Sequence, residues 1–148
     1  MTGFEVLYAL VCDDVRQEVG GKVSYIGQFD AINVQKLPVM LSKLCMVHAV
    51  KGVPGKYRVK TSLISKKTQR IVIEIPEHEI EIKSDSHKVR QVYQLHNVKL
   101  EDASEYIVKI EYNGLEFYSY DFVVTNNLKN SVPPDGGPMQ MPIKLSQN

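Results

Sequence analysis

The sequence has no tryptophan and only two cysteines among its 148 residues. It also has no long apolar run near its start, because Asp13 and Asp14 close the run at residues 6–11 well before it could cross a membrane. No basic segment precedes that run, so neither a secretory signal nor membrane association is predicted. We therefore expect a cytoplasmic protein with Cys12 and Cys45 as free thiols, although a disulfide between them is geometrically allowed.

Motifs that carry catalysis or hold a cofactor are missing as well. The sequence contains no G-x-S-x-G, no Cys-x-x-Cys and no phosphate-binding glycine loop. Its histidines lack the spacing of metal ligands, and each is interpreted as structural: His48, His78, His87 and His96. We predict that the protein is not an enzyme and that it needs neither a cofactor nor a metal.

Charge of one sign is not in excess. The 18 Lys and Arg residues nearly balance the 17 Asp and Glu residues, leaving a net charge of +1. Such a chain has no overall field to attract nucleic acid. Lys56, Arg58 and Lys60 do alternate along one expected strand, but no aromatic residues interleave with them. A solvated strand face is favoured there over an anion-binding surface.

What the sequence does contain is alternation with a period of two. Tyr106, Val108 and Ile110, for example, alternate with Lys109 and Glu111, as in a strand with one buried face. Turn residues separate such runs at short intervals. The expected strands lie near residues 4–12, 22–35, 43–51, 56–65, 69–76, 78–83, 88–97, 105–113 and 115–124, some of which are expected to merge.

Local details refine this pattern. Asn113-Gly114 predicts a tight hairpin, because both residues tolerate a positive φ. Runs 4–12 and 43–51 are apolar on both faces, so they should be central or covered on both sides. Helix is expected at most as a single turn, over 13–19 or 101–104.

One segment is typical of a particular kind of sandwich. Leu100 precedes Tyr106 by six residues, and Tyr106 opens an alternating strand. This arrangement resembles the tyrosine corner of immunoglobulin-like and fibronectin type III-like domains, in which the tyrosine hydroxyl bonds to the preceding backbone. The tryptophan of those domains and their disulfide spacing are absent. We expect an all-β, immunoglobulin-like antiparallel β-sandwich of roughly seven to nine strands with an extended C-terminal tail.

The composition changes after Thr125. Residues 126–148 include adjacent prolines and glycines that a core strand would not hold. We expect a sandwich domain over 1–125 and a tail over 126–148 that is either disordered or docked on a partner. Met139, Met141 and Ile143 alternate with polar residues and proline, which is the pattern of a strand that adds to a sheet edge, so they are candidate binding residues.

The most charged connection lies between the first two runs. Asp13, Asp14, Arg16, Glu18 and Lys22 occupy a few residues there, more charge than a hairpin needs. Three interpretations stay open. The first is a salt-bridged corner, in which the acids cap the turn, Arg16 makes a two-pronged bond to a carboxylate, and a helical turn packs through Val15 and Val19. The others are a hard-cation site and a partner-binding patch.

A resemblance rests on the same region. Residues 10–16 read LVCDDVR, and residues 21–30 read GKVSYIGQFD. This is similar to the start of a family of small uncharacterised bacterial proteins, with the match dense over residues 7–38. The resemblance implies a compact β-rich domain, from bacteria or their phages, with no assigned activity and no catalytic residues.

The last expected strand is rich in aromatic residues. Tyr118, Tyr120 and Phe122 share one face, while Phe117 lies on the other. Core packing is favoured, and exposed tyrosines of this kind also suit protein interfaces. We predict a non-enzymatic interaction or structural module that binds a protein partner or itself through the tail and through Tyr118 and Tyr120. The alternative is a metal- or small-ligand-binding module that uses the loop 13–22.

Overall fold

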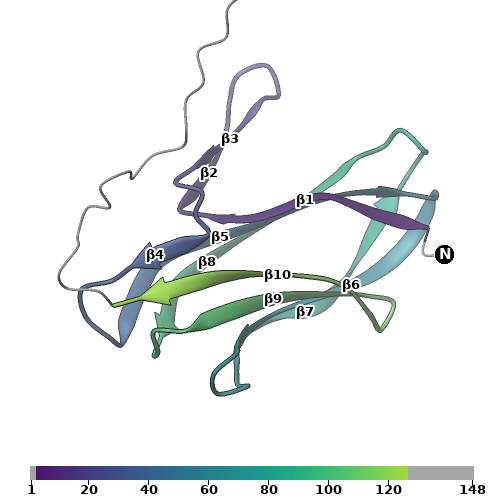
Figure 1. Cartoon of the computed structure of the whole chain (residues 1–148). Coiled ribbons are helices and arrows are strands. Elements are labelled where there is room, and N and C mark those ends of the chain that lie inside the picture. The colour runs from purple at the N-terminus through teal and green to yellow at the C-terminus, as the bar shows by residue number, and fades with distance from the viewer. Residues whose placement is uncertain (1–2, 127–148) are drawn as a thin grey trace, which may run out of the picture.

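The computed structural model describes residues 3–126, which form two β-sheets packed face to face and a projecting hairpin (Figure 1). The first sheet has the order β1-β5-β8, the second has the order β4-β10-β9-β6-β7, and β2 and β3 form the hairpin. The predicted all-β sandwich is confirmed. The strands are β1 Phe4–Cys12, β2 Asp14–Gln17, β3 Val23–Ile26, β4 Ala31–Asn33, β5 Val39–Gly52, β6 Gly55–Ser65, β7 Ile71–Ile82, β8 Val89–Leu100, β9 Glu105–Tyr112 and β10 Leu115–Thr125.

Pairing is antiparallel except at one short contact. β4 runs parallel to the end of β10, where Ala31 is opposite Val123 and Asn33 is opposite Thr125. The predicted tight turn joins β9 to β10, with φ of 51° at Asn113 and 80° at Gly114. Both values lie in the left-handed region that such a turn requires. This hairpin places the start of β10 at the same end of the sandwich as the start of β1, where Phe4 and Phe117 have ring centres 6.0 Å apart (Figure 1).

Three expectations about the elements are wrong. No helical turn forms over 13–19: Asp14–Gln17 is a strand, and Val19 is 98% exposed instead of packed. Residues 101–104 form bends. The run 22–35 is split between β3 and β4. The runs 69–76 and 78–83, by contrast, merge into one strand, β7, in keeping with the expectation that some runs merge. β7 lies at a sheet edge, where Pro76 can lack an N–H without breaking the ladder.

The two strands that are apolar on both faces have different places. β5 is central in its sheet, and residues 44–50 are all buried, as predicted. β1 is an edge strand, with both faces covered at its end, where Val11 and Cys12 are buried. The hairpin supplies the cover on the outer side, because Val15 and Tyr25 pack on Cys12. The charged connection therefore has a packing role in addition to its ion pairs.

The core between the sheets contains two apolar clusters. One surrounds Tyr106 and Phe122, whose rings stack 5.6 Å apart, and the other surrounds Phe4 and Ile110. The Tyr106 hydroxyl donates to the Asp102 carbonyl at 2.9 Å and accepts from the Asp102 N–H at 3.2 Å. This is the backbone bond that the sequence predicted for Tyr106, and it fixes the connection between β8 and β9.

Candidate functional site

The acidic connection is held by ion pairs at the base of the hairpin. The Asp14 carboxylate accepts from the Val15 N–H at 2.9 Å, and it pairs with Lys43 of β5 and with Arg16 Nε, the latter at 3.3 Å. Lys43, and then Arg16, hold the pKa of Asp14 below its ordinary value. Asp14 therefore bonds the backbone of the next residue within β2 and does not cap a turn, and its principal cation is Lys43, which lies 29 residues away in the sequence.

The other charged residues of this loop do not join Asp14. Asp13 bonds through its main chain to Ile26 at 2.9 Å, while Glu18 and Lys22 close the hairpin turn through a backbone bond of 2.7 Å. Glu18 and Lys22 are exposed. Among residues 3–126, no three His, Cys, Asp or Glu side chains are grouped so that they could hold a metal ion. The hard-cation interpretation of this loop therefore lacks a ligand set.

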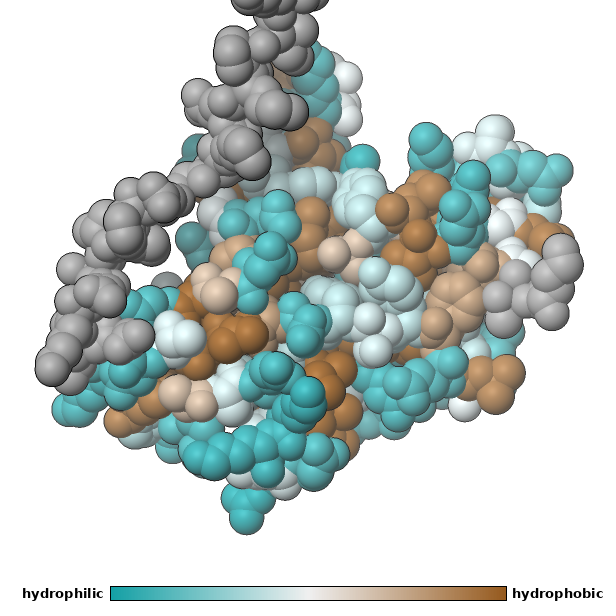
Figure 2. Space-filling view, viewed as in Figure 1, coloured by the Kyte–Doolittle hydropathy of each residue, from teal (hydrophilic) through white to brown (hydrophobic). Residues whose placement is uncertain are grey.

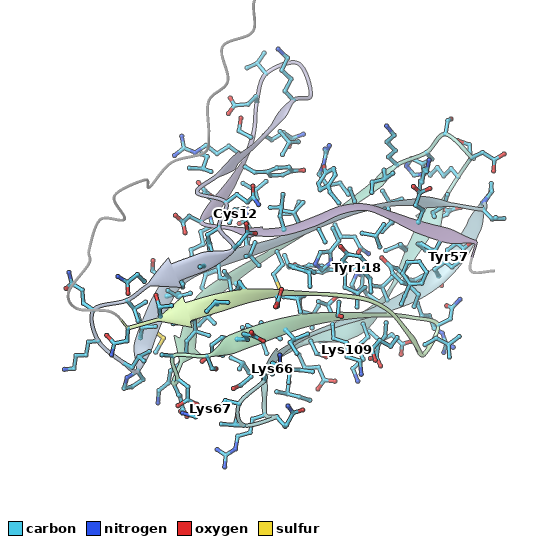
Figure 3. All side chains as sticks on the ribbon, viewed as in Figure 1. Cys12, Tyr57, Lys66, Lys67, Lys109 and Tyr118 are labelled. Atoms are coloured by element: carbon cyan, nitrogen blue, oxygen red, sulfur yellow. The ribbon has the colours of Figure 1, made fainter. Side chains whose placement is uncertain are left out.

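The basic strand face is neutralised by its neighbour. Lys60 of β6 contacts Glu74 of β7 at 2.5 Å, and Lys56 and Arg58 contact Glu79 and Glu77 at 3.5 and 3.6 Å. Lys66, Lys67 and Lys109, labelled in Figure 3, also have acidic partners. Such exposed pairs add little stability each, but each of these cations has an acidic neighbour. A solvated face fits this arrangement better than an anion-binding one.

Polar side chains cross the middle of the core. His48 is fully buried, and its Nε2 lies 2.8 Å from the Tyr120 hydroxyl. Burial lowers the pKa of His48 to about 4, so the ring is neutral at pH 7. Its Nδ1 has no hydrogen-bond partner within the described part of the chain. The interpretation of His48 as a structural histidine fits its burial, but only one of its two ring nitrogens, Nε2, has a hydrogen-bond partner among the described residues.

Rings continue this polar layer toward both edges of the sandwich. Tyr118, labelled in Figure 3, has its ring centre 6.2 Å from that of Tyr120 at the edge where β10 faces β1. The ring centre of Tyr93 lies 5.6 Å from that of His48. Tyr93 in turn bonds to His78 Nε2 at 3.1 Å. Tyr120 is therefore a core residue, and Tyr118 is 37% exposed at the edge. Figure 2 shows apolar and weakly polar residues among charged ones on this side.

A bulge in β10 explains why its aromatic residues lie on both faces in the sequence. The register of β10 against β9 shifts between Glu116 and Tyr118. Because of the shift, both Phe117 and Tyr120 pack against the core cluster around Phe4. An extra residue of this kind is typical of strands that must redirect a side chain. Here it directs Phe117 to the end of the sandwich, where a cavity opens.

That cavity has a volume of about 350 Å³ and is lined mainly by aromatic rings. Phe4 contacts Tyr57 edge to face with ring centres 4.1 Å apart, and it stacks on Tyr112 at 4.2 Å. Phe117 lies 5.3 Å from Tyr112 and completes the wall. The hydroxyl of Tyr57, the residue labelled at this end of the sandwich in Figure 3, donates to the Val53 carbonyl at 2.6 Å and so fixes the ring. We call this the Phe4 pocket.

The rim of the Phe4 pocket carries exposed aliphatic groups beside the polar residues Asn113 and Glu116. Leu115, which lines the pocket, is 69% exposed, and the neighbouring Val53 is 57% exposed. Exposed aliphatic groups beside an apolar cavity are typical of binding surfaces. Sequence reasoning missed these residues because they come from three distant parts of the chain. The unusual position of Phe117 in its strand was the one local signal.

The predicted site residues are thus not one site. Asp13, Asp14 and Arg16 lie at the base of the hairpin, Glu18 and Lys22 at its tip, and Tyr118 and Tyr120 in β10. Met139, Met141 and Ile143, and the tail interpretation with them, lie outside the described residues.

Comparisons with known proteins give a family. A family model described as a family of unknown function, DUF6941, matches residues 7–125. No curated protein matches the sequence.

Solved structures share parts of the fold at low identity. One is the alkylpurine DNA glycosylase AlkC of Pseudomonas fluorescens bound to DNA, with a TM-score of 0.50 and 11% identity over 83% of this chain and 30% of that one. Another is a β-glucosidase of Listeria innocua, with a TM-score of 0.48 and 10% identity over 82% of this chain and 16% of that one. An immunoglobulin-like protein of Pseudomonas aeruginosa has a TM-score of 0.37 and 12% identity over 77% of this chain and 90% of that one. The chain spans less than a third of the first two proteins, and these similarities concern the fold alone.

In the described part of the chain, no helix is available that could cross a membrane.

Proposed function

We propose that this chain, which belongs to the DUF6941 family of unknown function, is a non-enzymatic interaction module that binds an apolar side chain of a protein partner in the Phe4 pocket. The observation that carries the proposal is the exposed Leu115 at the rim of an aromatic cavity. Aromatic residues are enriched at protein interfaces, and a few buried anchors supply most of the affinity there.

The size of the pocket favours a single bulky side chain. A volume of about 350 Å³ is at the lower end of the range for ligand cavities. Its walls are rings from β1, β6, β9 and β10, which are rigid because they belong to the sandwich. A preformed wall of this kind loses little conformational entropy on binding. The partner is therefore a protein segment that presents phenylalanine or leucine, from another protein or from a second copy of this chain.

The titratable groups of the core support the non-enzymatic part of the proposal. His48 is buried with a pKa of about 4, so it is a poor base at neutral pH. Burial raises the pKa of the Cys12 thiol to about 11, the opposite of what a nucleophilic cysteine needs. The free thiols also support the expectation of a cytoplasmic protein. The loop alternative is less favoured, because the Asp14 carboxylate is already paired.

The test is a titration of the full chain with N-acetyl-L-phenylalaninamide, followed by heteronuclear NMR. About 15 non-hydrogen atoms at about −0.3 kcal/mol each give a dissociation constant on the order of 1 mM. We expect saturable shifts at Leu115 and Phe117, and no saturation with N-acetylglycinamide. Leu115→Asp should abolish the shifts. Ile71→Asp, which changes another exposed aliphatic residue (56%), should leave them unchanged.

Two results would contradict the proposal. One is an absence of saturable shifts with the phenylalanine compound. The other is equal loss of binding in the Leu115 and Ile71 variants, which would mean that general surface hydrophobicity is responsible. Sedimentation of the protein over a concentration series then shows whether the chain self-associates, which distinguishes binding to a second copy from binding to a different protein. Self-association through the pocket should disappear with Leu115→Asp.

A further inference from the structure

The only two cysteines of the sequence meet across neighbouring strands. β1 and β5 pair antiparallel with Cys12 directly opposite Cys45, so both side chains lie on the same face of the sheet. This is the outer face, away from the core between the sheets and from the Phe4 pocket. Both residues are fully buried, and they form a small cluster with Val47.

The register places the two residues within reach of a covalent bond. Directly opposed residues of antiparallel strands have Cα atoms about 4.5 or 5.5 Å apart, depending on their hydrogen bonding. Disulfides join residues whose Cα atoms are about 4.4 to 6.8 Å apart. Either kind of pair therefore falls within the range of a disulfide, and β1 and β5 would have to move little.

The β2–β3 hairpin covers the pair. Val15 and Tyr25 pack against the cysteine cluster from the hairpin side. Cys12 Sγ donates to the Asp14 carbonyl at 3.4 Å, and Cys45 Sγ donates to the Asp13 carbonyl at 3.8 Å. Figure 3 shows Cys12 at the base of the hairpin. Burial raises the pKa of both thiols, so they are protonated and unreactive while the hairpin is closed.

We propose that Cys12 and Cys45 are a redox pair that closes a cross-strand disulfide when the β2–β3 hairpin opens to a low-molecular-weight disulfide. One thiolate attacks oxidised glutathione, forms a mixed disulfide and releases one glutathione thiol. The second cysteine then displaces the other glutathione. Two protein thiols and one oxidised glutathione become one protein disulfide and two glutathione thiols, which carry the two protons.

Oxidation also changes the hairpin. It removes both S–H donors from the carbonyls of Asp13 and Asp14, where the chain passes from β1 into β2. The hairpin is a two-stranded unit, which is marginal without such supports. The oxidation state of the pair is therefore transmitted to the base of the projecting hairpin, and amide exchange there should be faster in the oxidised protein.

The experiment follows oxidation of the full chain by oxidised glutathione, with intact mass measured after denaturation. We expect a monomer lighter by two hydrogens and without free thiols. Tyr25→Ala removes part of the cover and should accelerate the reaction by about tenfold or more, because cysteine reactivity depends on exposure. Tyr118→Ala, a tyrosine on the other sheet, should leave the rate unchanged. If Tyr25→Ala does not fold, Asp14→Asn should accelerate oxidation about 1.5- to 5-fold through loss of its ion pairs.

Several outcomes would overturn the inference. A stable glutathione adduct on one cysteine of the wild-type protein would show that the pair cannot close. Disulfide-linked dimers would show that the reaction is between chains. Equal oxidation rates in the wild type and in a folded hairpin variant would show that the hairpin does not control access to the cysteines. Slower amide exchange at Val15 after oxidation would show that the disulfide does not loosen the hairpin. Cys12→Ser should give the adduct on Cys45 and no internal bond.

Discussion

Acid should destabilise the protein through His48. Its folded-state pKa of about 4 lies below the ordinary value of 6.5, because the ring is buried between the sheets. Between these values the unfolded chain binds a proton that the folded chain does not. Stability therefore rises with pH across this window and is lost as the pH falls from about 6.5 toward 4.

The magnitude follows from the two pKa values. The gap between 6.5 and about 4, at about 1.36 kcal/mol for each pKa unit, corresponds to about 3 kcal/mol. That is a large part of the 5–15 kcal/mol of a typical domain. The depressed pKa of Asp14 acts in the same direction, but its loss comes as the pH falls below the ordinary value of 3.8.

Urea denaturation at a series of pH values between 4.5 and 7.5 measures this effect. We expect the free energy of unfolding to fall with pH by up to about 1.36 kcal/mol per pH unit in the wild type. His48→Gln should be less stable at pH 7.5 and should have a much flatter profile. His96→Gln, which changes an exposed histidine of the same sheet, should keep the wild-type profile. An unchanged slope in His48→Gln would show that His48 is not the group whose protonation destabilises the fold.

Two further predictions concern single contacts. Tyr106→Phe removes a buried hydroxyl that bonds twice to Asp102, and it should lower the free energy of unfolding by about 1–3 kcal/mol in urea; a change below 0.5 kcal/mol would contradict this role. Gly27→Ala should lower the melting temperature more than Gly20→Ala: both glycines have positive φ, but a Cβ at Gly27 would also meet the Asp13 carboxylate, whereas the space around Gly20 is open. Equal losses in the two variants would show that the contact with Asp13 is unimportant.

The strands were predictable because their evidence is local. Alternation identified β9, and the positive-φ pair Asn113-Gly114 identified its connection to β10. Pro76 separates the two expected runs that make up β7, since a proline interrupts a strand in the interior of a sheet but is tolerated at an edge. Whether a strand lies at an edge is decided by pairing with distant segments, which alternation does not report.

The acidic connection was misjudged for a similar reason. Its charge suggested a salt-bridged corner with a helical turn, a cation site or a partner-binding patch. The ion pairs are present, but the segment is a strand, and the main partner of Asp14, Lys43, belongs to β5. The apolar residues Val15 and Tyr25 decide its conformation, because they cover Cys12 and Cys45. The only local signal in the sequence for a hairpin that packs on the outside of the sandwich is the glycine pair of its turn, Gly20-Gly21.

The Phe4 pocket could not be predicted, because its rings are contributed by β1, β6, β9 and β10. Each of these aromatic residues alone is consistent with core packing. Only the β10 bulge, which shifts the register after Glu116, brings Phe117 onto the face that packs against Phe4. The sandwich was therefore predictable, whereas the cavity at its end depends on long-range pairing.

Intermolecular NOEs between bound N-acetyl-L-phenylalaninamide and the full chain would locate an apolar side chain on the protein surface. If the Phe4 pocket receives an apolar side chain, the ring protons of the ligand should give cross-peaks to the Leu115 methyl groups and to the rings of Phe4 and Phe117. Saturable binding with cross-peaks at the hairpin or at Tyr118 instead, and none at Leu115, would contradict binding in the Phe4 pocket.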